Sequence, residues 1–265
     1  MVNSFHVLGD PVSHSLSPKI HAAAYKVLDL DWTYTAIQVV KGDLVSFLES
    51  NTADGYSITM PLKYEAAGIA DVRDGLVSLT DVANTLHRTE IGLSAYNTDV
   101  FGINKALESV LAKTVEVVAI LGAGATAKSA MVAIAKAKPN ALFDIYVRDL
   151  ARAEDIVALA GELEVFQSIH LLEEFSNFQD LTVNTLPLDA SDALPEHAQK
   201  GFLLNANYAG GDSALVSTFD SNRVISGQTM LVWQALQQIR IFTGVGLNEP
   251  LPNESAVVSA MFEAL

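Results

Sequence analysis

The chain has no cysteine among its 265 residues. This absence excludes disulfides, metal sites built from thiolates, and catalysis by a thiol nucleophile. The six histidines are scattered without the spacing of metal ligands, so no metal site is predicted. Long hydrophobic runs are absent too, and none approaches the length that spans a membrane.

Positive charge is scarce. Lys and Arg number 16 against 31 Asp and Glu, which gives a formal net charge of −15. Such an acidic protein is poorly suited to binding nucleic acid or an anionic membrane. An anionic ligand must therefore be bound locally, by backbone N–H groups, hydroxyls and a few cations. The first residues, MVNSFHVLGD, lack the basic start and long apolar core of a signal peptide, so a soluble cytoplasmic protein is expected.

The most informative segment lies in mid-chain, at residues 117–127 with the sequence VVAILGAGATA. An apolar strand leads into a Gly-x-Gly-x-x-Ala turn, and the helix-forming segment KSAMVAIAKAK follows. In a dinucleotide-binding turn the glycines permit the bend and the approach of a pyrophosphate, which lies on free N–H groups at the helix start. An ordinary strand-to-helix turn is the alternative. The predicted cofactor loop comprises Gly122, Ala123, Gly124, Ala125, Thr126 and Ala127.

Apolar strands and amphipathic helices alternate along most of the chain. This alternation predicts an α/β fold with largely parallel sheets and helices on both faces. Strands are expected at 5–8, 32–39, 55–58, 84–88, 93–96, 141–147, 180–184 and 201–205. Helices are expected at 18–29, 42–50, 99–112, 126–138, 150–161, 212–219, 228–243 and 253–264.

More than a hundred residues precede the glycine loop, so a second α/β domain is expected in front of the cofactor domain. The two terminal helices exceed what the cofactor domain needs, and they are predicted to return to the front domain. The predicted division is a substrate-binding and catalytic domain of residues 1–99 plus 236–265, and a Rossmann-type dinucleotide-binding domain of residues 100–235.

Polar residues of the front domain cluster at strand ends and turns, where ligands bind in open α/β sheets. Ser15 and Ser17 stand at the start of a helix, where hydroxyls and free N–H groups bind a carboxylate or simply cap the helix. Lys63 follows a strand and a Met-Pro-Leu turn, either as a proton donor near apolar surface or as a solvated loop lysine. Further candidates, each also explained by capping or a buried hydrogen bond, are Asn84, Asp99 and Gln234.

Taken together, six motifs resemble the shikimate dehydrogenases, and they occur in the family's order from residue 9 to residue 234. They are GDPVSHSLSP (9–18), TMPLK (59–63), ANT (83–85), NTDVFG (97–102), the glycine loop (122–127) and GQTMLVWQ (227–234). The resemblance therefore covers nearly the whole chain.

The resemblance implies reversible hydride transfer between NADPH and the ketone of 3-dehydroshikimate, a step of aromatic amino-acid biosynthesis. It implies that Ser15 and Ser17 hold the substrate carboxylate and that Lys63 and Asp99 form the catalytic pair. Ketone reduction develops negative charge on oxygen, which an ammonium group can stabilise and protonate. The other substrate-binding residues implied are Thr59, Asn84, Tyr208 and Gln234, and Gly227 joins the cofactor site.

The chain departs from the family pattern at three places. Ser57 stands where the family has Asn before Val-Thr, so one polar substrate contact is lost or replaced. Residues 183–188, VNTLPL, replace an N-A-T-S-x-G-M segment that walls the nicotinamide ring. Asn205 takes the place of an Asp ahead of the family's Tyr. None of these changes removes the catalytic pair.

Cofactor preference depends on residues 147–152, with the sequence VRDLAR. Arg148 and Arg152 can flank the 2′-phosphate of NADP with charge-assisted hydrogen bonds. Asp149 can instead bind the ribose 2′-OH of NAD and repel a phosphate. Two arginines against one carboxylate favour NADP, and NAD stays open.

Three other functions remain open. An NAD-dependent quinate/shikimate dehydrogenase is one, although the Ser17 hydroxyl matches the shikimate type better. A methylene-tetrahydrofolate-type dehydrogenase has the same two-domain layout but needs a longer, aromatic-lined cleft. A non-catalytic dinucleotide-binding sensor needs neither Lys63 nor Asp99. The expected partner is a small-molecule substrate rather than nucleic acid or membrane, and the expected assembly is a monomer or a homodimer.

Overall fold

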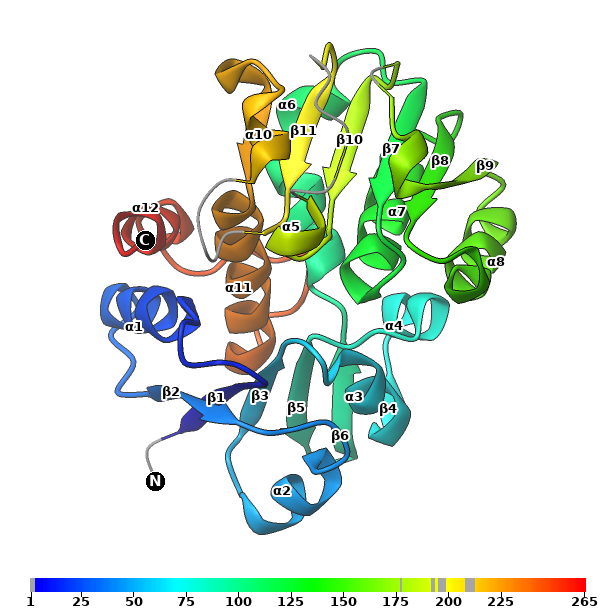
Figure 1. Cartoon of the computed structure of the whole chain (residues 1–265). Helices are drawn as coiled ribbons and strands as arrows, with labels where there is room; N and C mark the ends of the chain where they lie inside the picture. Colours follow the sequence, from blue (N-terminus) through cyan, green and yellow to red (C-terminus); the bar gives the residue numbers. More distant parts are fainter. Residues whose placement is uncertain (1–2, 177, 192–193, 195–198, 208–212) are drawn as a thin grey trace. The chain divides into compact units, whose positions relative to one another are not determined.

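The computed structural model describes residues 3–176, 178–191, 194, 199–207 and 213–265, and the chain divides into two compact units (Figure 1). Unit 1 comprises Met1–Gly102 and Leu231–Leu265, and unit 2 comprises Ile103–Met230. Both boundaries fall inside helices, namely α5 (Asp99–Ala106) and α11 (Gly227–Thr243). Each unit is built around its own six-stranded sheet.

The sheet of unit 1 has the strand order β2-β1-β3-β5-β6-β4. Neighbouring strands pair in parallel except that β5 runs antiparallel to both β3 and β6. The last residues of β1, β3 and β6 and the first residue of β5 therefore lie at one edge of the sheet. The strands are β1 (Ser4–Gly9), β2 (Thr33–Gln38), β3 (Gly55–Ile58), β4 (Val72–Arg73), β5 (Thr85–Thr89) and β6 (Gly92–Tyr96).

Helices cover both faces of this sheet. Because side chains alternate along a strand, Leu8, Tyr56 and Leu86 lie in one core with residues of α2 (Leu44–Ser50) and α3 (Lys63–Ile69). On the opposite face Phe5 stacks on Phe242 of α11, with ring centroids 4.4 Å apart. Helix α1 (Ser17–Val27) lies beside the C-terminal helix α12 (Glu254–Glu263), blue beside red in Figure 1, and α4 (Gly75–Thr80) packs on β6.

Glycine at position 55 permits the close approach of α11 to β3. A Cβ atom at Gly55 would lie 2.7 Å from the ring of Phe242 and 3.1 Å from the carbonyl oxygen of Leu86. Any larger residue would push the helix away from the strand. Because Gly55 has no side chain, α11 lies close enough to β3 for its polar side chains to contact Ser57, two residues further along the strand.

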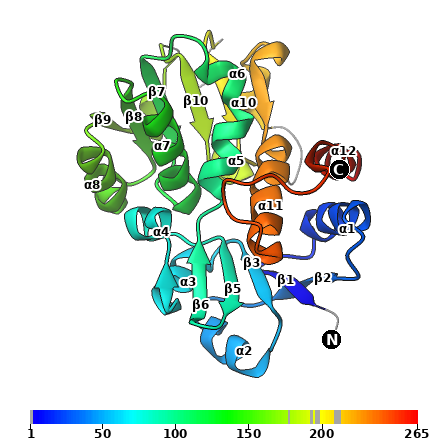
Figure 2. The same ribbon diagram turned by 180° about the vertical axis from the view of Figure 1, so that it is seen from behind.

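The sheet of unit 2 is parallel throughout, with the order β12-β11-β10-β7-β8-β9. If β7 is counted as strand 1 and the sheet is read from β9, the order is 3-2-1-4-5-6, as in dinucleotide-binding folds. Figure 2 shows β9, β8, β7 and β10 side by side. The strands are β7 (Val117–Leu121), β8 (Leu142–Val147), β9 (Phe166–Leu171), β10 (Leu181–Asn184), β11 (Phe202–Asn205) and β12 (Val224–Ser226). The helices include α6 (Glu108–Leu111), α7 (Ala125–Ala137), α8 (Glu154–Glu162), α9 (Leu188–Ser191) and α10 (Ala214–Ser217).

The predicted fold class is confirmed, and every expected strand is present. The prediction of one continuous helix at 99–112 is wrong, because α5 ends at Ala106 and the short α6 begins at Glu108. The helix expected at 150–161 begins as a separate 3₁₀ turn at Leu150–Arg152, and the one expected at 212–219 is reduced to α10 in its described part. Within the described residues, no helix has the length and hydrophobicity to cross a membrane.

Candidate active site

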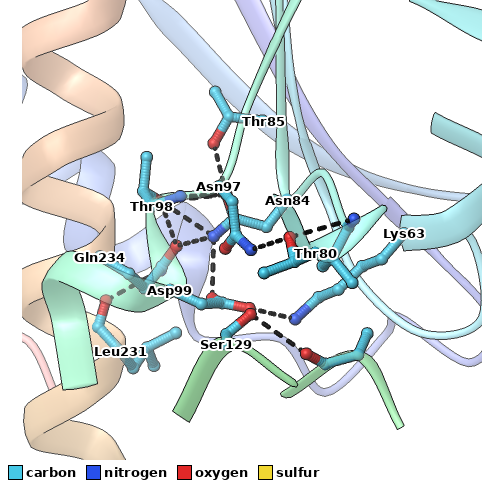
Figure 3. Close-up of polar contacts among 12 residues, drawn as sticks. Lys63, Thr80, Asn84, Thr85, Asn97, Thr98, Asp99, Ser129, Leu231 and Gln234 are labelled. Carbon is cyan, nitrogen blue, oxygen red and sulfur yellow. Dashed lines mark hydrogen bonds and ion pairs between the residues drawn. The ribbon is translucent and has the colours of Figure 1, made fainter. Parts of the chain in front are cut away.

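Polar side chains gather at the edge of the unit 1 sheet where three strands end and β5 begins. Lys63 is the first residue of α3, in the connection that follows β3. Asn84 directly precedes β5, and Asp99 begins α5 just after β6. Figure 3 shows these three side chains pointing toward one another, with Gln234 of α11 beside them. The topology of the sheet therefore brings together residues from four distant parts of the sequence.

Lys63 and Asp99 form a short, buried ion pair. The Lys63 Nζ donates to Asp99 Oδ2 at 2.6 Å, and the two side chains are 13% and 5% exposed. The Lys63 backbone is held as well, because its carbonyl oxygen accepts a hydrogen bond from the Ala83 amide at 3.0 Å. This location excludes the solvated loop lysine considered from the sequence. Among the described residues the ammonium group bonds only to Asp99, so two of its three N–H donors remain for a ligand.

Asn84 is the hub of the cluster, and it is 2% exposed. Its Nδ2 donates to Asp99 Oδ1 and to Thr98 Oγ1, both at 2.8 Å. Its Oδ1 accepts from the backbone N–H of Thr98 at 2.8 Å and from the Thr85 hydroxyl at 2.9 Å. Asn84 thus holds the carboxylate oxygen that Lys63 leaves free, and Asp99 is bonded on both of its oxygens.

Gln234 joins the cluster from α11. Its Nε2 donates to the carbonyl oxygen of Leu231 at 2.9 Å, and its Oε1 lies 3.3 Å from Asn84 Nδ2. The amide is 8% exposed and sits among apolar helix residues. The sequence left two explanations for Gln234, a buried structural hydrogen bond and a place in the site. The structure shows that the side chain makes the hydrogen bond and also lies beside the ion pair.

The turns after β1 and β3 pack against each other at the same edge. A Cβ atom at Gly9 would collide with the Thr59 side chain and lie 2.9 Å from the carbonyl oxygen of Met60. Ser15 Oγ accepts a hydrogen bond from the Ser17 amide at 3.3 Å, whereas the N-cap residue of α1, Leu16, has no side-chain cap. Ser17 is 5% exposed. In the described part of the chain no polar contact joins Ser15, Ser17 or Thr59 to Asn84 or its partners.

Ser57, which replaces the family's Asn, points toward α11. Its hydroxyl accepts from the Tyr34 hydroxyl at 2.5 Å and donates to Gln238 Oε1 at 2.7 Å. Gln238 lies one helical turn after Gln234 and is 1% exposed. The departure from the family pattern has therefore become part of a buried hydrogen-bond chain within unit 1.

In unit 2 the glycine loop has the geometry that its sequence predicts. Gly122 has φ +107°, and a Cβ there would lie 2.6 Å from Thr185 Oγ1. Gly124 caps the N-terminus of α7, and a Cβ there would meet nothing within 4 Å. The first residues of α7, Ala125, Thr126 and Ala127, carry N–H groups that a helix leaves without internal partners. The open side of Gly124 thus leads to a helix N-terminus suited to a pyrophosphate.

The residues after β8 form a tight polar turn. Asp149 Oδ1 accepts from the Ala151 amide at 3.0 Å and caps the 3₁₀ turn Leu150–Arg152. Its Oδ2 lies 3.8 Å from Nε of Arg152, whose side chain is 84% exposed. Arg148 is exposed as well. The Asp149 carboxylate is therefore bonded within its own turn, and two exposed arginines lie in the same segment.

The remaining predicted residues have other surroundings. A Cβ at Gly227 would lie 2.7 Å from the carbonyl oxygens of Asn205 and Ala206, so this glycine serves the packing of α11 against β11. Asn205 Oδ1 accepts from Asn184 Nδ2 at 3.0 Å, which ties the ends of β10 and β11 together. Tyr208, predicted to bind substrate, lies outside the described residues.

Three residues of the cluster have no role predicted from the sequence. Thr98 and Thr85 stand next to Asp99 and Asn84, and both bond to the Asn84 side chain. Their place inside the recognised motifs was a signal for both. Gln238 carried no such signal, because it is one of two adjacent glutamines in an apolar helix and only packing distinguishes them.

Known proteins match both the sequence and the structure. Residues 7–86 match the family model described as shikimate dehydrogenase substrate binding domain. The chain is 30% identical to a shikimate dehydrogenase (NADP(+)) of Methanococcoides burtonii, over 92% of this chain and 93% of that protein.

Two solved structures extend this comparison. The crystal structure of Mycobacterium tuberculosis shikimate dehydrogenase has a TM-score of 0.83 and 31% identity, over 98% of this chain and 99% of that one. A Thermus thermophilus shikimate 5-dehydrogenase in complex with NADP(H) and shikimate has a TM-score of 0.78 and 26% identity, over 99% and 100%. Sequence, fold and cluster agree, and the chain belongs to the shikimate dehydrogenase family.

Proposed function

We propose that the chain catalyses reversible hydride transfer between NADPH and the ketone of 3-dehydroshikimate, with shikimate as the reduced product. The observation that carries this proposal is the buried Lys63–Asp99 pair with Asn84 on the second carboxylate oxygen. A relative of 30% identity named shikimate dehydrogenase (NADP(+)) supports it, as does the related structure bound to NADP(H) and shikimate. A dinucleotide sensor would need no such pair.

Bound NADPH would supply the hydride that reduces the carbonyl carbon. Lys63 donates a hydrogen bond to the carbonyl oxygen and passes its proton to that oxygen as negative charge develops. In the direction of oxidation, neutral Lys63 accepts the proton of the alcohol. Its position on the first residue of α3, fixed by the Ala83 contact, keeps the nitrogen in place through both directions.

Asp99 positions this nitrogen and a neighbouring substrate hydroxyl. Asn84 keeps the carboxylate from rotating, because it holds Oδ1 while Lys63 holds Oδ2. Such preorganisation is worth orders of magnitude in rate. We assign the ring hydroxyls to Thr59, Lys63, Asn84, Asp99 and Gln234, the carboxylate to Ser15 and Ser17, and a further substrate contact to Tyr208.

The residues of unit 2 fit an NADP molecule. The open N-terminus of α7 beside Gly124 suits the pyrophosphate, and Gly122 and Gly227 allow the close backbone packing around it. Asp149 caps its own turn and faces Arg152, so its charge is partly neutralised where a 2′-phosphate would bind. Arg148 and Arg152 would then hold that phosphate. This arrangement supports NADP over NAD.

The wider assignments follow from the same reaction. Residues 1–99 plus 236–265 are proposed as the substrate domain and residues 100–235 as the cofactor domain. The reaction places the chain in aromatic amino-acid biosynthesis, and we assign it to the cytoplasm as a monomer or homodimer acting on a small molecule.

Steady-state kinetics test the proposal. Shikimate and quinate are each assayed with NADP⁺ and with NAD⁺, by growth of absorbance at the reduced-nicotinamide band. The expected result is a kcat/KM for shikimate with NADP⁺ that exceeds the other three combinations. Folded protein that binds a dinucleotide and turns over neither alcohol would overturn the proposed reaction, and a clear preference for NAD⁺ would overturn the cofactor assignment.

A further inference from the structure

A continuous chain of buried hydrogen bonds runs from Tyr34 to the Lys63–Asp99 pair. Its first half consists of Tyr34, Ser57 and Gln238, which are 9%, 5% and 1% exposed. The Tyr34 hydroxyl donates to Ser57, and Ser57 donates to Gln238 Oε1 at 2.7 Å. Gln238 Nε2 then donates to Thr85 Oγ1 at 3.0 Å and to the Asn84 carbonyl oxygen at 3.1 Å. Three elements, β2, β3 and α11, contribute to this half.

The second half passes from Thr85 to the ion pair. Thr85 is completely buried, and its hydroxyl donates to Asn84 Oδ1 at 2.9 Å. Asn84 Nδ2 donates to Asp99 Oδ1 at 2.8 Å, and Lys63 donates to the other carboxylate oxygen. Every link lies within the part of unit 1 that the structure describes, so the chain does not depend on the placement of unit 2.

The direction of each hydrogen bond is fixed by groups that can act in one way only. A backbone N–H can only donate, so the Thr98 amide requires the oxygen of Asn84 to face it and the nitrogen to face Asp99. A backbone carbonyl can only accept, so the Asn84 carbonyl requires the nitrogen of Gln238. Thr85 therefore accepts from Gln238 and must give its single proton to Asn84.

We propose that Gln238, Ser57 and Thr85 are positioning residues, and that their hydrogen-bond chain holds the Asn84 amide in the orientation that fixes Asp99 and Lys63. The proposal rests on the function given above. Buried polar networks act together when every member is satisfied, and a missing member leaves its neighbours unpaired. Loss of Gln238 leaves the Asn84 carbonyl oxygen with the Ile58 amide, at 2.7 Å, as its remaining donor, and it frees the Thr85 hydroxyl to rotate away from Asn84. None of the three residues touches the ion pair itself.

Matched substitutions at Thr85 test this role. Thr85→Val keeps the shape of the side chain and removes the hydroxyl, whereas Thr85→Ser keeps the hydroxyl. We expect Thr85→Val to lower kcat for shikimate oxidation about ten- to hundredfold with little change in KM, since small displacements of a catalytic group cost this much. Thr85→Ser is expected to stay within about threefold of the unsubstituted protein. Equal kcat for the two folded variants would overturn the proposal.

Gln238→Leu tests the chain at its other half, with Gln237→Leu as the control. Gln237 is also buried on α11, but it bonds to Leu247 and Arg240 rather than to the chain. Gln238→Leu is expected to lower kcat as Thr85→Val does, and the double variant to fall no further, because both remove the same coupling. A comparable loss of kcat in Gln237→Leu, or full additivity, would contradict the positioning role.

A measurement without substrate separates this inference from the proposed function. The side-chain amide signal of Asn84 in a ¹H–¹⁵N spectrum is identified by its absence in Asn84→Asp. In the ligand-free protein it is expected to shift in Thr85→Val and Gln238→Leu and to stay unchanged in Thr85→Ser and Gln237→Leu. An unchanged signal in all four variants overturns the proposed positioning role of the hydrogen-bond chain. If the signal shifts but the protein does not turn over shikimate, the positioning role of the hydrogen-bond chain stands and the proposed reaction is overturned.

Discussion

Buried polar side chains in unit 1 differ in how many of their hydrogen-bonding groups the protein uses. Asn84 and Gln238 use both ends of their amides, and they act as fixed parts of the scaffold. Lys63 uses one donor of three among its described contacts and keeps the others for a ligand. At the scale of single residues, this difference separates Lys63, the proposed reacting group, from the groups that hold it.

His21 in α1 is a buried titratable residue outside the proposed chemistry. Its ring stacks on Tyr34 at 3.9 Å, and its Nδ1 lies 3.2 Å from the Tyr25 hydroxyl. Burial lowers the pKa of His21 to about 3, against a smaller raising effect of the facing Gln238 side chain. The unfolded chain, with the ordinary pKa of 6.5, therefore binds this proton more readily than the folded protein does.

The stability that depends on neutral His21 is complete above pH 6.5 and is lost as the pH falls toward 3. The expected loss is about 1.4 kcal/mol of unfolding free energy per pH unit. His21→Gln should lose less stability than the unsubstituted protein between pH 6.5 and 4.5 in urea unfolding. The exposed His14, as His14→Gln, provides the control for a histidine substitution outside this buried site. Parallel curves for His21→Gln and the unsubstituted protein would contradict the pKa shift.

At the scale of elements, the strand-to-helix turn from β7 to α7 contains two glycines with separate roles. Gly122 has a positive φ and a crowded Cβ position, whereas Gly124 has φ −84° and open space. Gly122→Ala should therefore lower the unfolding free energy by about 1–3 kcal/mol. Gly124→Ala should fold nearly normally and weaken NADP⁺ binding more than tenfold by placing a methyl group in the path of the pyrophosphate. Denaturant unfolding and dinucleotide titration of both variants check this, and the reverse pattern would refute the division of roles.

The C-terminal helices are held together by a second buried ion pair. Arg240 of α11 binds both carboxylate oxygens of Glu254 at the start of α12, at 2.7 and 3.0 Å, with the side chains 9% and 21% exposed. Glu254→Ala leaves the buried guanidinium without its counterion and should lower the unfolding free energy by about 3 kcal/mol. The exposed Glu249, as Glu249→Ala, should change it little. Similar stability in both variants would show that the Arg240 pair is not important for α12.

For the whole molecule, the sequence predicts elements better than it predicts long-range partners. The branched apolar runs of β1, β7 and β8 and the glycine turn carry their structure locally, so the two-sheet arrangement could be predicted. Short edge strands such as β4, with two residues, lack enough pattern to be recognised. The Ser57–Gln238 contact joins residues 181 positions apart, and it depends on the packing of α11 that Gly55 permits.

The candidate site shows the same limit. The motifs place Lys63, Asn84 and Asp99 beside strand ends, where ligand sites generally form, and the structure brings these three side chains into contact. The sequence did not predict that Asp149 caps its own turn, because an Asp at this position is equally compatible with binding the ribose of a dinucleotide. The backbone geometry after β8 decides whether Asp149 caps the turn, and the sequence pattern does not specify that geometry.

The most direct test of the account is the turnover of shikimate with NADP⁺ by Lys63→Ala, measured beside Lys105→Ala, which removes a lysine that pairs with Glu108 at the surface. Loss of the group that exchanges the proton should lower kcat about 10³-fold, while NADP⁺ binding stays close to that of the unsubstituted protein. Because the buried Asp99 loses its counterion, the unfolding transition of Lys63→Ala is measured to confirm that the variant is folded. Lys105→Ala should keep near-normal kcat. Near-normal kcat in folded Lys63→Ala would contradict the proposed role of the Lys63–Asp99 pair.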